Sequence, residues 1–332
     1  VPPTGDIDPN AIVYGPSQTT TQMNNNAVAL FDSALTRDPT NQMAMIGKGR
    51  ALLNLGLYAQ ADAAVATVGN NFVFHVEHST NTTVQNNAIS VLIDNGRYAI
   101  SNLEGGTTAT GAALAPDAGS NSGTSNATAE GLPFRGLKDP RVPFEPKQPL
   151  RTDGSNTGAC FTRSRTCWTL DNYPTFDAQV PVASGTEARL IQAEAALNRG
   201  DPASMIVILN DLRARVASIL PILYPQQKQV FPLATVGAPV LAPLVDPGTP
   251  DTERAMLFQE RALWLFATGH RLGDLRRLVR NYALPSTSVF PTGPYFRGGG
   301  TFGSDVAYPV PFNEENNTQF VRAACVTTSA GT

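Results

Sequence analysis

Residues 31–65 read FDSALTRDPTNQMAMIGKGRALLNLGLYAQADAAV, and this stretch decides the class of the fold. Apolar residues in and just before it recur at the spacing of one helical face, namely Ala27, Leu30, Phe31, Ala34 and Leu35. A helix is therefore expected from about Gln22 to Asp38, where Pro39 excludes helical geometry in the residue before it. The pattern predicts two further helices, over about 41–55 and about 58–68, separated by Gly56.

The same stretch resembles the tetratricopeptide repeat, a pair of packed helices. Ala27, Phe31, Ala34 and Pro39 fit the second helix of one repeat. The turn of the next repeat reads L-G-x-Y-x-x-A and is formed by Leu55, Gly56, Tyr58 and Ala61. Small residues at such positions let helices approach closely, while the aromatic side chains fill the groove between them. Because a helix pair cannot bury its apolar face alone, further pairs are expected downstream.

The remainder of the chain alternates between helical and irregular stretches. A second helix pair is predicted over about 186–199 and 203–220, with a stop and a restart at Gly200-Asp201-Pro202. Six prolines make 221–250 a long loop, and one strong helix is expected from about 252 to 281. FVFHV (72–76) fits a short strand, and 104–130 is a low-complexity loop that we expect to be ordered by packing on its own fold or on a neighbouring subunit.

Together these patterns predict a mainly α fold of tetratricopeptide-like antiparallel helix pairs, with long irregular loops and little β structure. Residues 1–21 are predicted to form an extended arm. Residues 22–332 are predicted to form a single helical domain with loop-rich insertions at about 69–184 and 221–250.

Composition excludes several functional classes. A net charge of −3 and a pI near 5.7 give no electrostatic footprint for nucleic acid or an anionic membrane. Charged residues make up only 15% of the chain, so its polar surface must come mainly from Asn, Thr, Ser, Gln and Gly, as is common in exported proteins. No apolar run reaches the roughly 18–20 residues that span a bilayer. Because the first residue is Val1, we expect either a removed leader or a longer precursor, whose upstream part could carry a lipid.

The cysteines favour an oxidising compartment. Cys160 and Cys167 lie seven residues apart in CFTRSRTC, and we expect them to form a disulfide that closes a short loop. The alternative, a metal or redox pair, lacks a second pair and a nearby His to complete a zinc set. Cys325 is then left over, either buried or paired between chains.

Four ordered elements resemble the SusD/RagB family of outer-membrane nutrient-binding proteins. The first is Lys138-Asp139-Pro140-Arg141, and the second is the pair EARLIQAEAALNRGD and LNDLRARV. The third is the signature helix region, with Glu260-Arg261, Trp264-Leu265-Phe266, Gly269-His270-Arg271 and Asp274-Leu275-Arg276-Arg277. The fourth is Tyr308-Pro309-Val310-Pro311 followed by Glu314 and Asn317. The chain departs from the family in its shorter front part.

The resemblance implies a non-enzymatic binding protein without cofactor or metal, at the bacterial outer-membrane surface or outside the cell. Its ligand would be a glycan or another oligomeric nutrient, and its partner a TonB-dependent outer-membrane transporter. The rival hypothesis is an extracellular structural subunit that reuses this scaffold to self-assemble into a filament or tube. It is motivated by the shorter front part, the polar arm and the expected ordering of 104–130, because an arm docking on the next subunit makes a contact that propagates.

The charged signature residues have two interpretations. Glu260, Arg261, Arg271, Asp274, Arg276 and Arg277 make up the signature. On one long helix, Glu260 and Arg271 would share a face with Asp274 one turn further on, as an acid/base cluster. We favour a buried ion-pair network that locks the helix to its neighbours. His75 and His78 lack an evident third metal ligand and are interpreted as exposed or hydrogen-bonded, and His270 as a packing residue.

Sugar binding requires aromatic faces beside amide or carboxylate groups. The candidate ligand-binding aromatics lie in predicted loops and are Trp168, Tyr173, Phe72, Phe74, Tyr98, Tyr295 and Phe296. Trp168 is the best single candidate, because a disulfide at Cys167 would hold it rigidly. The alternative, that Trp168 covers the helical core, has equal weight.

Overall fold

The computed structural model describes most of the helical part of the chain. The described residues are 15–98, 100, 131–147, 167–227, 239–292, 302–311, 314, 316–317, 319–320 and 327–328. The predicted arm therefore lies largely outside this part, and so does the loop 104–130.

Helices dominate the described residues. They are α1 (Thr20–Arg37), α2 (Gln42–Asn54), α3 (Tyr58–Val65), α4 (Ala88–Asp94), α5 (Phe134–Leu137), α6 (Gly185–Asn198), α7 (Pro202–Ala214), α8 (Val216–Leu223), α9 (Pro250–Trp264), α10 (Arg271–Arg280) and α11 (Ser286–Val289), with a short 3-10 helix, η2 (Thr83–Gln85). The strands are β1 (Val73–Val76), β2 (Phe144–Lys147), β3 (Cys167–Leu170) and β4 (Val180–Ser184). The prediction of a mainly α fold with little β structure is confirmed.

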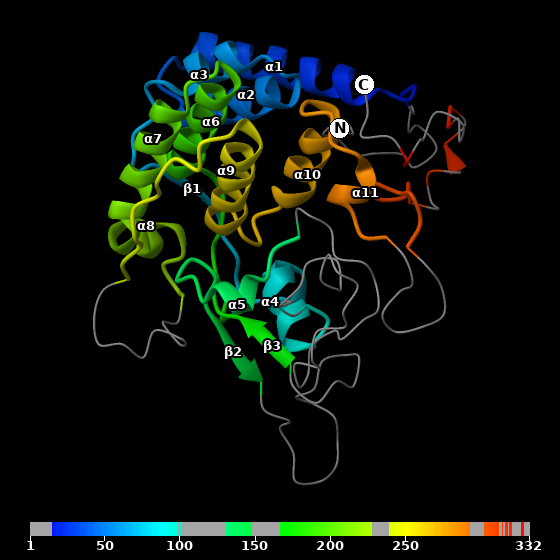
Figure 1. Cartoon of the computed structure of the whole chain (residues 1–332). Coiled ribbons are helices and arrows are strands. Elements are labelled where there is room, and N and C mark those ends of the chain that lie inside the picture. The colour runs from blue at the N-terminus through cyan, green and yellow to red at the C-terminus, as the bar shows by residue number, and fades with distance from the viewer. Residues whose placement is uncertain are drawn as a thin grey trace, which may run out of the picture.

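The upper body in Figure 1 is a row of helix pairs in which α1 packs on α2, α2 on α3, α3 on α6, and α6 on α7. The contact between α1 and α2 depends on Gly47, because a Cβ there would lie 2.2 Å from Cζ of Phe31. The aromatic ring thus fills the space that the absent side chain leaves, as the tetratricopeptide-like pattern predicts.

Side-chain caps set where these helices begin. Thr19 and Gln22 form a reciprocal capping box, so α1 begins two residues earlier than its apolar pattern indicates. Asn41 caps α2 by accepting a hydrogen bond from the amide of Ala44. Asp201 caps α7 in the same way, with Pro202 at the first helical position.

Two small antiparallel sheets flank the helices. β1 pairs with β4, which agrees with the short strand expected at 72–76, and β2 pairs with β3. β4 continues directly into α6, and at this junction the amide of Gly185 donates to the carbonyl of Phe72 at 2.8 Å. This junction joins the upper helical row to the lower part of the molecule, where α4, α5, β2 and β3 lie (Figure 1).

The prediction of one long helix over 252–281 is wrong, because this stretch forms two helices. α9 ends at Trp264 and α10 starts at Arg271, so residues 265–270 form a turn between them. Ala267 has φ 56° and Gly269 has φ 85°, and left-handed backbone cannot continue a right-handed helix. Apolar periodicity hides the break, since Leu265 and Phe266 are buried like the helical residues before them.

The expected loop at 221–250 also starts late. Pro221 lies inside α8, which continues to Leu223, and 239–249 is irregular as predicted.

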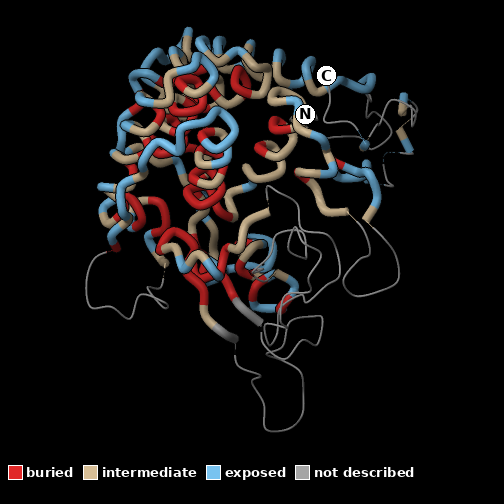
Figure 2. Tube along the Cα trace, in the orientation of Figure 1, coloured by how far each residue is buried: buried red, intermediate tan, exposed pale blue. Residues whose placement is uncertain are grey.

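Buried residues gather where the helices face one another (Figure 2). The largest apolar cluster lies among α6, α7, α8 and α9 and extends to α4, α5, β2 and β3. A second cluster lies among α2, α3 and α6. No helix in the described ranges is both long and apolar enough to span a membrane.

Candidate functional site

A buried network of four charges joins α6, α9 and α10. The Arg277 guanidinium donates to both carboxylate oxygens of Glu194, at 3.0 and 2.8 Å, and also to Asp274 at 2.9 Å. Arg261 donates twice to Asp274, at 3.0 Å each, and lies 3.5 Å from Glu194. The four side chains are at most 3% exposed, and their formal charges sum to zero.

A second network joins α9 to α7 and to the segment before β2. Glu260 accepts from Arg141 at 2.5 Å and from Arg213 at 2.6 Å, while Asp139 binds the other edge of the Arg141 guanidinium. The guanidinium of Arg141 also lies over the ring of Trp264, 4.9 Å from its centroid.

These contacts replace the acid/base geometry that one long helix would have given. Glu260 and Arg271 do not share a helical face, because the turn at 265–270 places them on different helices. Each carboxylate of the two networks has at least one arginine partner. Arg276, the remaining arginine of the signature on α10, is partly buried, and this burial lowers its pKa.

Charge pairing controls the ionisation of the buried carboxyl groups. Burial alone would raise the pKa of Asp274, but Arg261 and Arg277 outweigh it and hold that pKa well below its usual range. For Glu187, burial is likewise outweighed by His270 and Arg50, which lower its pKa to about 2. Neither carboxyl is therefore placed to act as a general acid near neutral pH.

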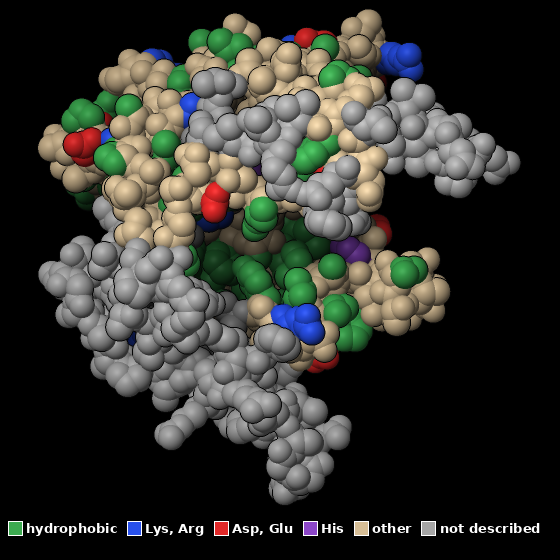
Figure 3. Space-filling view, turned by 90° about the vertical axis from the view of Figure 1, so that its right-hand side faces the viewer, with side chains coloured by type: hydrophobic (Ala, Val, Ile, Leu, Met, Phe, Trp, Pro, Cys, Tyr) green, Lys and Arg blue, Asp and Glu red, His purple; other side chains and the backbone are tan. Residues whose placement is uncertain are grey.

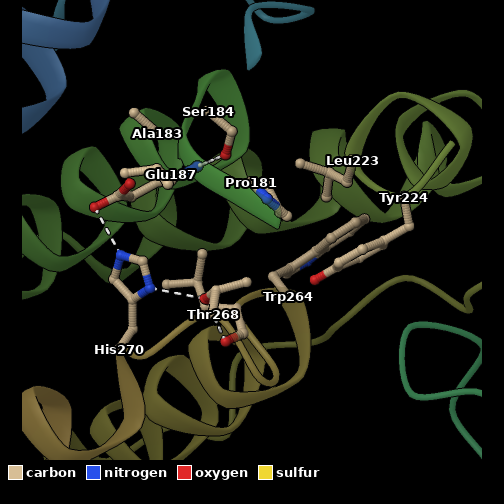
Figure 4. A pocket seen from close by; sticks show the side chains of 11 residues that line it. Pro181, Ala183, Ser184, Glu187, Leu223, Tyr224, Trp264, Thr268 and His270 are labelled. Carbon is tan, nitrogen blue, oxygen red and sulfur yellow. Dashed lines mark hydrogen bonds and ion pairs between the residues drawn. The ribbon is translucent and has the colours of Figure 1, made fainter. Parts of the chain in front are cut away.

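Figure 4 shows a chain of three side chains that mimics a catalytic triad. Nδ1 of His270 lies 2.8 Å from Oγ1 of Thr268, and Nε2 of His270 lies 3.1 Å from Oε1 of Glu187. The hydroxyl of Thr268, however, donates to the carbonyl of Leu265 at 2.7 Å, and Arg50 binds both oxygens of Glu187. The adjoining cavity of about 10 Å³ has room for about one water molecule and excludes a substrate.

A groove of about 510 Å³ lies on the other side of the same turn. Its lining residues are Ile89, Leu92, Tyr98, Ile100, Phe134, Ala262, Leu265, Phe266, Ala267, Gly269, Arg271, Leu272 and Tyr308. Figure 3 shows a hollow lined with hydrophobic side chains between the upper helical body and the lower part of the molecule. Its volume falls within the range of about 300–1,000 Å³ that is common for small-molecule sites.

Hydrogen bonds on the buried side fix the wall of the groove. Three successive carbonyl oxygens of the α9–α10 turn accept hydrogen bonds, one from Thr268 of the turn itself and two from tyrosines of the core. The pairs are Leu265 with Thr268 at 2.7 Å, Phe266 with Tyr224 at 3.4 Å, and Ala267 with Tyr173 at 3.3 Å. Because these backbone acceptors are satisfied within the protein, the turn presents mainly apolar atoms to the groove.

The aromatic candidates lie in different places. Tyr98 lines the groove, whereas Tyr173 is 1% exposed and offers no open ring face. Phe72 is half-buried against the upper apolar cluster, and Phe74 on β1 is 43% exposed. Trp168 lies in β3, and its side chain is not among the described parts of the structure.

Several other candidates fall outside the described residues. They are Tyr295, Phe296, Cys160 and Cys325, together with the side chain of Cys167, so the disulfide stays a prediction. His75 donates through Nε2 to the carbonyl of Leu223 at 3.0 Å. Within the described ranges, no group of three or more His, Cys, Asp or Glu could hold a metal.

Sequence reasoning missed most of the groove. Ile89 and Leu92 come from α4, and Ile100 and Phe134 follow it within the same loop-rich stretch that was expected at about 69–184. One local signal was present, because Asn87 precedes the apolar run AISVLID and caps α4 through two backbone amides.

The comparisons with known proteins show a structural likeness but no sequence relative. No family model matches the chain, and no curated protein matches it. Among solved structures, it is similar to a SusD-like protein from Bacteroides fragilis NCTC 9343, with a TM-score of 0.47 and 13% sequence identity. The match covers 79% of this chain and 61% of that chain.

Proposed function

We propose that this chain is a non-enzymatic binding protein of the bacterial outer-membrane surface or the extracellular space, which captures an oligomeric nutrient in the apolar groove. Its partner would be a TonB-dependent transporter. The observation that carries the proposal is the groove itself, which is open, about 510 Å³ in volume and lined by a turn fixed from behind. The four sequence elements that resemble the SusD/RagB family support the cellular setting.

Capture without bond cleavage agrees with the chemistry of the described residues. The buried carboxylates are held in arginine pairs, and the Thr268–His270–Glu187 chain borders a cavity too small for a substrate. A wall fixed by hydrogen bonds loses little conformational freedom when a ligand binds, which favours affinity.

Binding screens with soluble glycans and with oligopeptides test this function. Leu92→Glu places a charge in the groove at a position that is 42% exposed, so the fold should tolerate it. Val84→Glu is the matched control, since Val84 is 91% exposed and lies outside the groove lining. A ligand that binds the parent chain and the control but not Leu92→Glu supports the proposal; failure of every ligand class in both screens contradicts it.

The transporter partner needs a separate experiment. Cross-linking on intact cells, followed by isolation of the chain, should recover a TonB-dependent transporter as the main product. Recovery of products that contain only this chain would contradict that partner.

Self-assembly is a second candidate, favoured by α1. This helix has 18 residues, yet none is buried, and Leu30 on it is 70% exposed. α1 stands at the end of the row of helix pairs, where a repeat array ordinarily needs a polar cap. Light scattering and electron microscopy of the native material decide between the two candidates. A structural subunit would form long regular assemblies, and Leu30→Glu would dissolve these assemblies whereas Val84→Glu would not.

A further inference from the structure

We propose that His270 is a positioning residue that makes binding in the groove depend on pH, because its protonation decides which atom receives the hydroxyl hydrogen of Thr268. This inference rests on the proposed function, since it concerns the regulation of the same groove. It follows from the hydrogen-bonding capacity of three side chains behind the wall of the groove. Glu187, His270 and Thr268 form a row that ends at the carbonyl of Leu265 (Figure 4).

The end of the row at Glu187 can only accept hydrogen bonds. Both oxygens of Glu187 bind Arg50, and the pKa of the carboxyl is lowered to about 2, so it is ionised near neutral pH and has no hydrogen to donate. Nε2 of His270, 3.1 Å from Oε1 of Glu187, must therefore carry a hydrogen. A neutral His270 ring then has a bare lone pair on Nδ1.

Thr268 has one hydroxyl hydrogen and two acceptors within reach. Its Oγ1 lies 2.7 Å from the carbonyl oxygen of Leu265 and 2.8 Å from Nδ1 of His270. When His270 is neutral, the contact with Nδ1 takes the hydroxyl hydrogen, and Leu265 loses its bond from the hydroxyl. When His270 is protonated, Nδ1 donates to Oγ1 and the hydroxyl hydrogen goes to Leu265. The imidazolium form thus satisfies all three contacts at once.

Leu265 connects this proton to the groove. Its side chain lines the groove, and the residue is only 6% exposed, so its carbonyl has little access to water. A buried acceptor that loses a hydrogen bond destabilises the conformation in which it lies. With His270 neutral, the carbonyl of Leu265 keeps the longer bond from the amide of Thr268, at 3.3 Å. The wall should therefore be held more firmly when His270 is protonated.

The charged and titratable groups around His270 keep their charge near neutral pH. Against the effect of burial, neighbouring cations lower the pKa values of Glu187 and Asp274, and burial raises the pKa of Tyr224. Between about pH 5 and 8, histidine is the side chain that ordinarily changes its charge. The groups considered, within the described residues, are Glu187 of α6, Arg50 of α2, Tyr224 at the end of α8, Arg261 of α9, and Asp274 and Arg277 of α10.

Ring ¹⁵N NMR spectra of the full chain with labelled histidine test the protonation step. The chain has three histidines, and the resonances of His270 are identified by their absence in His270→Gln. Between about pH 8 and 5, His270 should change from the neutral form with its hydrogen on Nε2 to the imidazolium. A ring that keeps one protonation state over this range, or a neutral ring with its hydrogen on Nδ1, would overturn the proposal.

Titration with N-phenyl-1-naphthylamine, an apolar fluorescent probe that stays neutral in this range, tests the effect on the groove. Leu92→Glu should abolish its binding, which places the probe in the groove. The parent chain should bind it about two- to tenfold more tightly at about pH 5 than at about pH 8, the factor that one net hydrogen bond contributes. Probe binding that is absent, or equal at the two pH values, would refute the role of His270.

Variants of matched shape separate this effect from loss of fold. Thr268→Val keeps the shape of the side chain but removes the hydroxyl, so binding should no longer depend on pH. Thr268→Ser restores the hydroxyl and should restore the pH dependence. His75→Gln is the control and should leave it unchanged, because His75 bonds to Leu223 and lies outside the groove lining. A pH dependence that persists in Thr268→Val would mean that another group causes it, and the proposal would fail.

The ligand screens, repeated at both pH values, distinguish this inference from the proposed function. If glycans or oligopeptides bind in a manner sensitive to Leu92→Glu but with equal affinity at both pH values, the role of His270 is excluded and the binding function stands. If none of them binds while the probe follows the protonation of His270, the positioning role stands and the proposed function fails.

Discussion

Replacing Glu194 by Gln should destabilise the fold strongly, although the two side chains have nearly the same shape. Glu194 is fully buried and accepts two of the hydrogen bonds that the Arg277 guanidinium donates, with Arg261 3.5 Å away. The substitution removes one of two negative charges from a neutral set of four. One arginine charge is then left buried without compensation.

The size of the effect follows from burial. Breaking a buried ion pair by removing one partner typically costs about 3–5 kcal/mol, because the remaining charge stays desolvated. A domain of ordinary stability has about 5–15 kcal/mol in total, so the variant should lose a large part of it. The amide of Gln can still accept one bond from Arg277, which places the expected loss near the lower end, at about 3 kcal/mol.

Urea unfolding followed by circular dichroism measures this loss. The matched control is Asp62→Asn, because Asp62 pairs with Arg199 at 3.4 Å on the surface, where an ion pair contributes about 0–1 kcal/mol. The midpoint should fall markedly for Glu194→Gln at an unchanged slope, and hardly at all for the control. A loss below about 1 kcal/mol for both variants would show that the network does not hold the helices together.

Three further predictions follow from single positions. Gly185→Ala should cost about 1–3 kcal/mol in the same assay, because its Cβ would lie 2.3 Å from the carbonyl oxygen of Gly69, whereas a loss near zero would mean that the β4–α6 junction can shift. Gly273→Ala should instead stabilise by up to about 1 kcal/mol, since α10 has open space there; destabilisation would contradict the helical packing described. The pKa of Glu187 is lowered to about 2, below its unfolded value near 4.5, so its charge contributes about 3 kcal/mol to the free energy of unfolding. This contribution is complete above about pH 5 and is lost as the pH falls toward 2. Glu187→Gln should therefore flatten the acid dependence in unfolding curves measured from about pH 7 to 2.

The local patterns of the sequence were sufficient to predict the row of packed helix pairs. They were insufficient to predict the residues that line the groove. Phe31 and the small residues around 47–49 carry short-range information, because helical period and close packing act within one pair of helices. The α9–α10 turn was hidden, since burial of Leu265 and Phe266 continues the apolar period past the helix end, and Gly269 was the one visible sign. The groove depends on residues from α4, α5 and α10 that meet only in the folded chain, and no single-sequence pattern specifies such a meeting.

The buried networks and the groove are parts of one arrangement, because both depend on the turn at 265–270. On its inner side, His270 contacts Glu187 of α6, and Asp274 one turn later joins α10 to α9 through Arg261. On its outer side, the same turn supplies Leu265 to the lining of the groove. A rigid apolar wall has to be held by contacts on its inner side, because its outer side faces the groove. The charged groups buried behind the wall provide such contacts, and their hydrogen bonds are directional. The buried signature residues thus position the wall of the groove, which explains why so many charged groups lie behind a groove whose described lining contains only one.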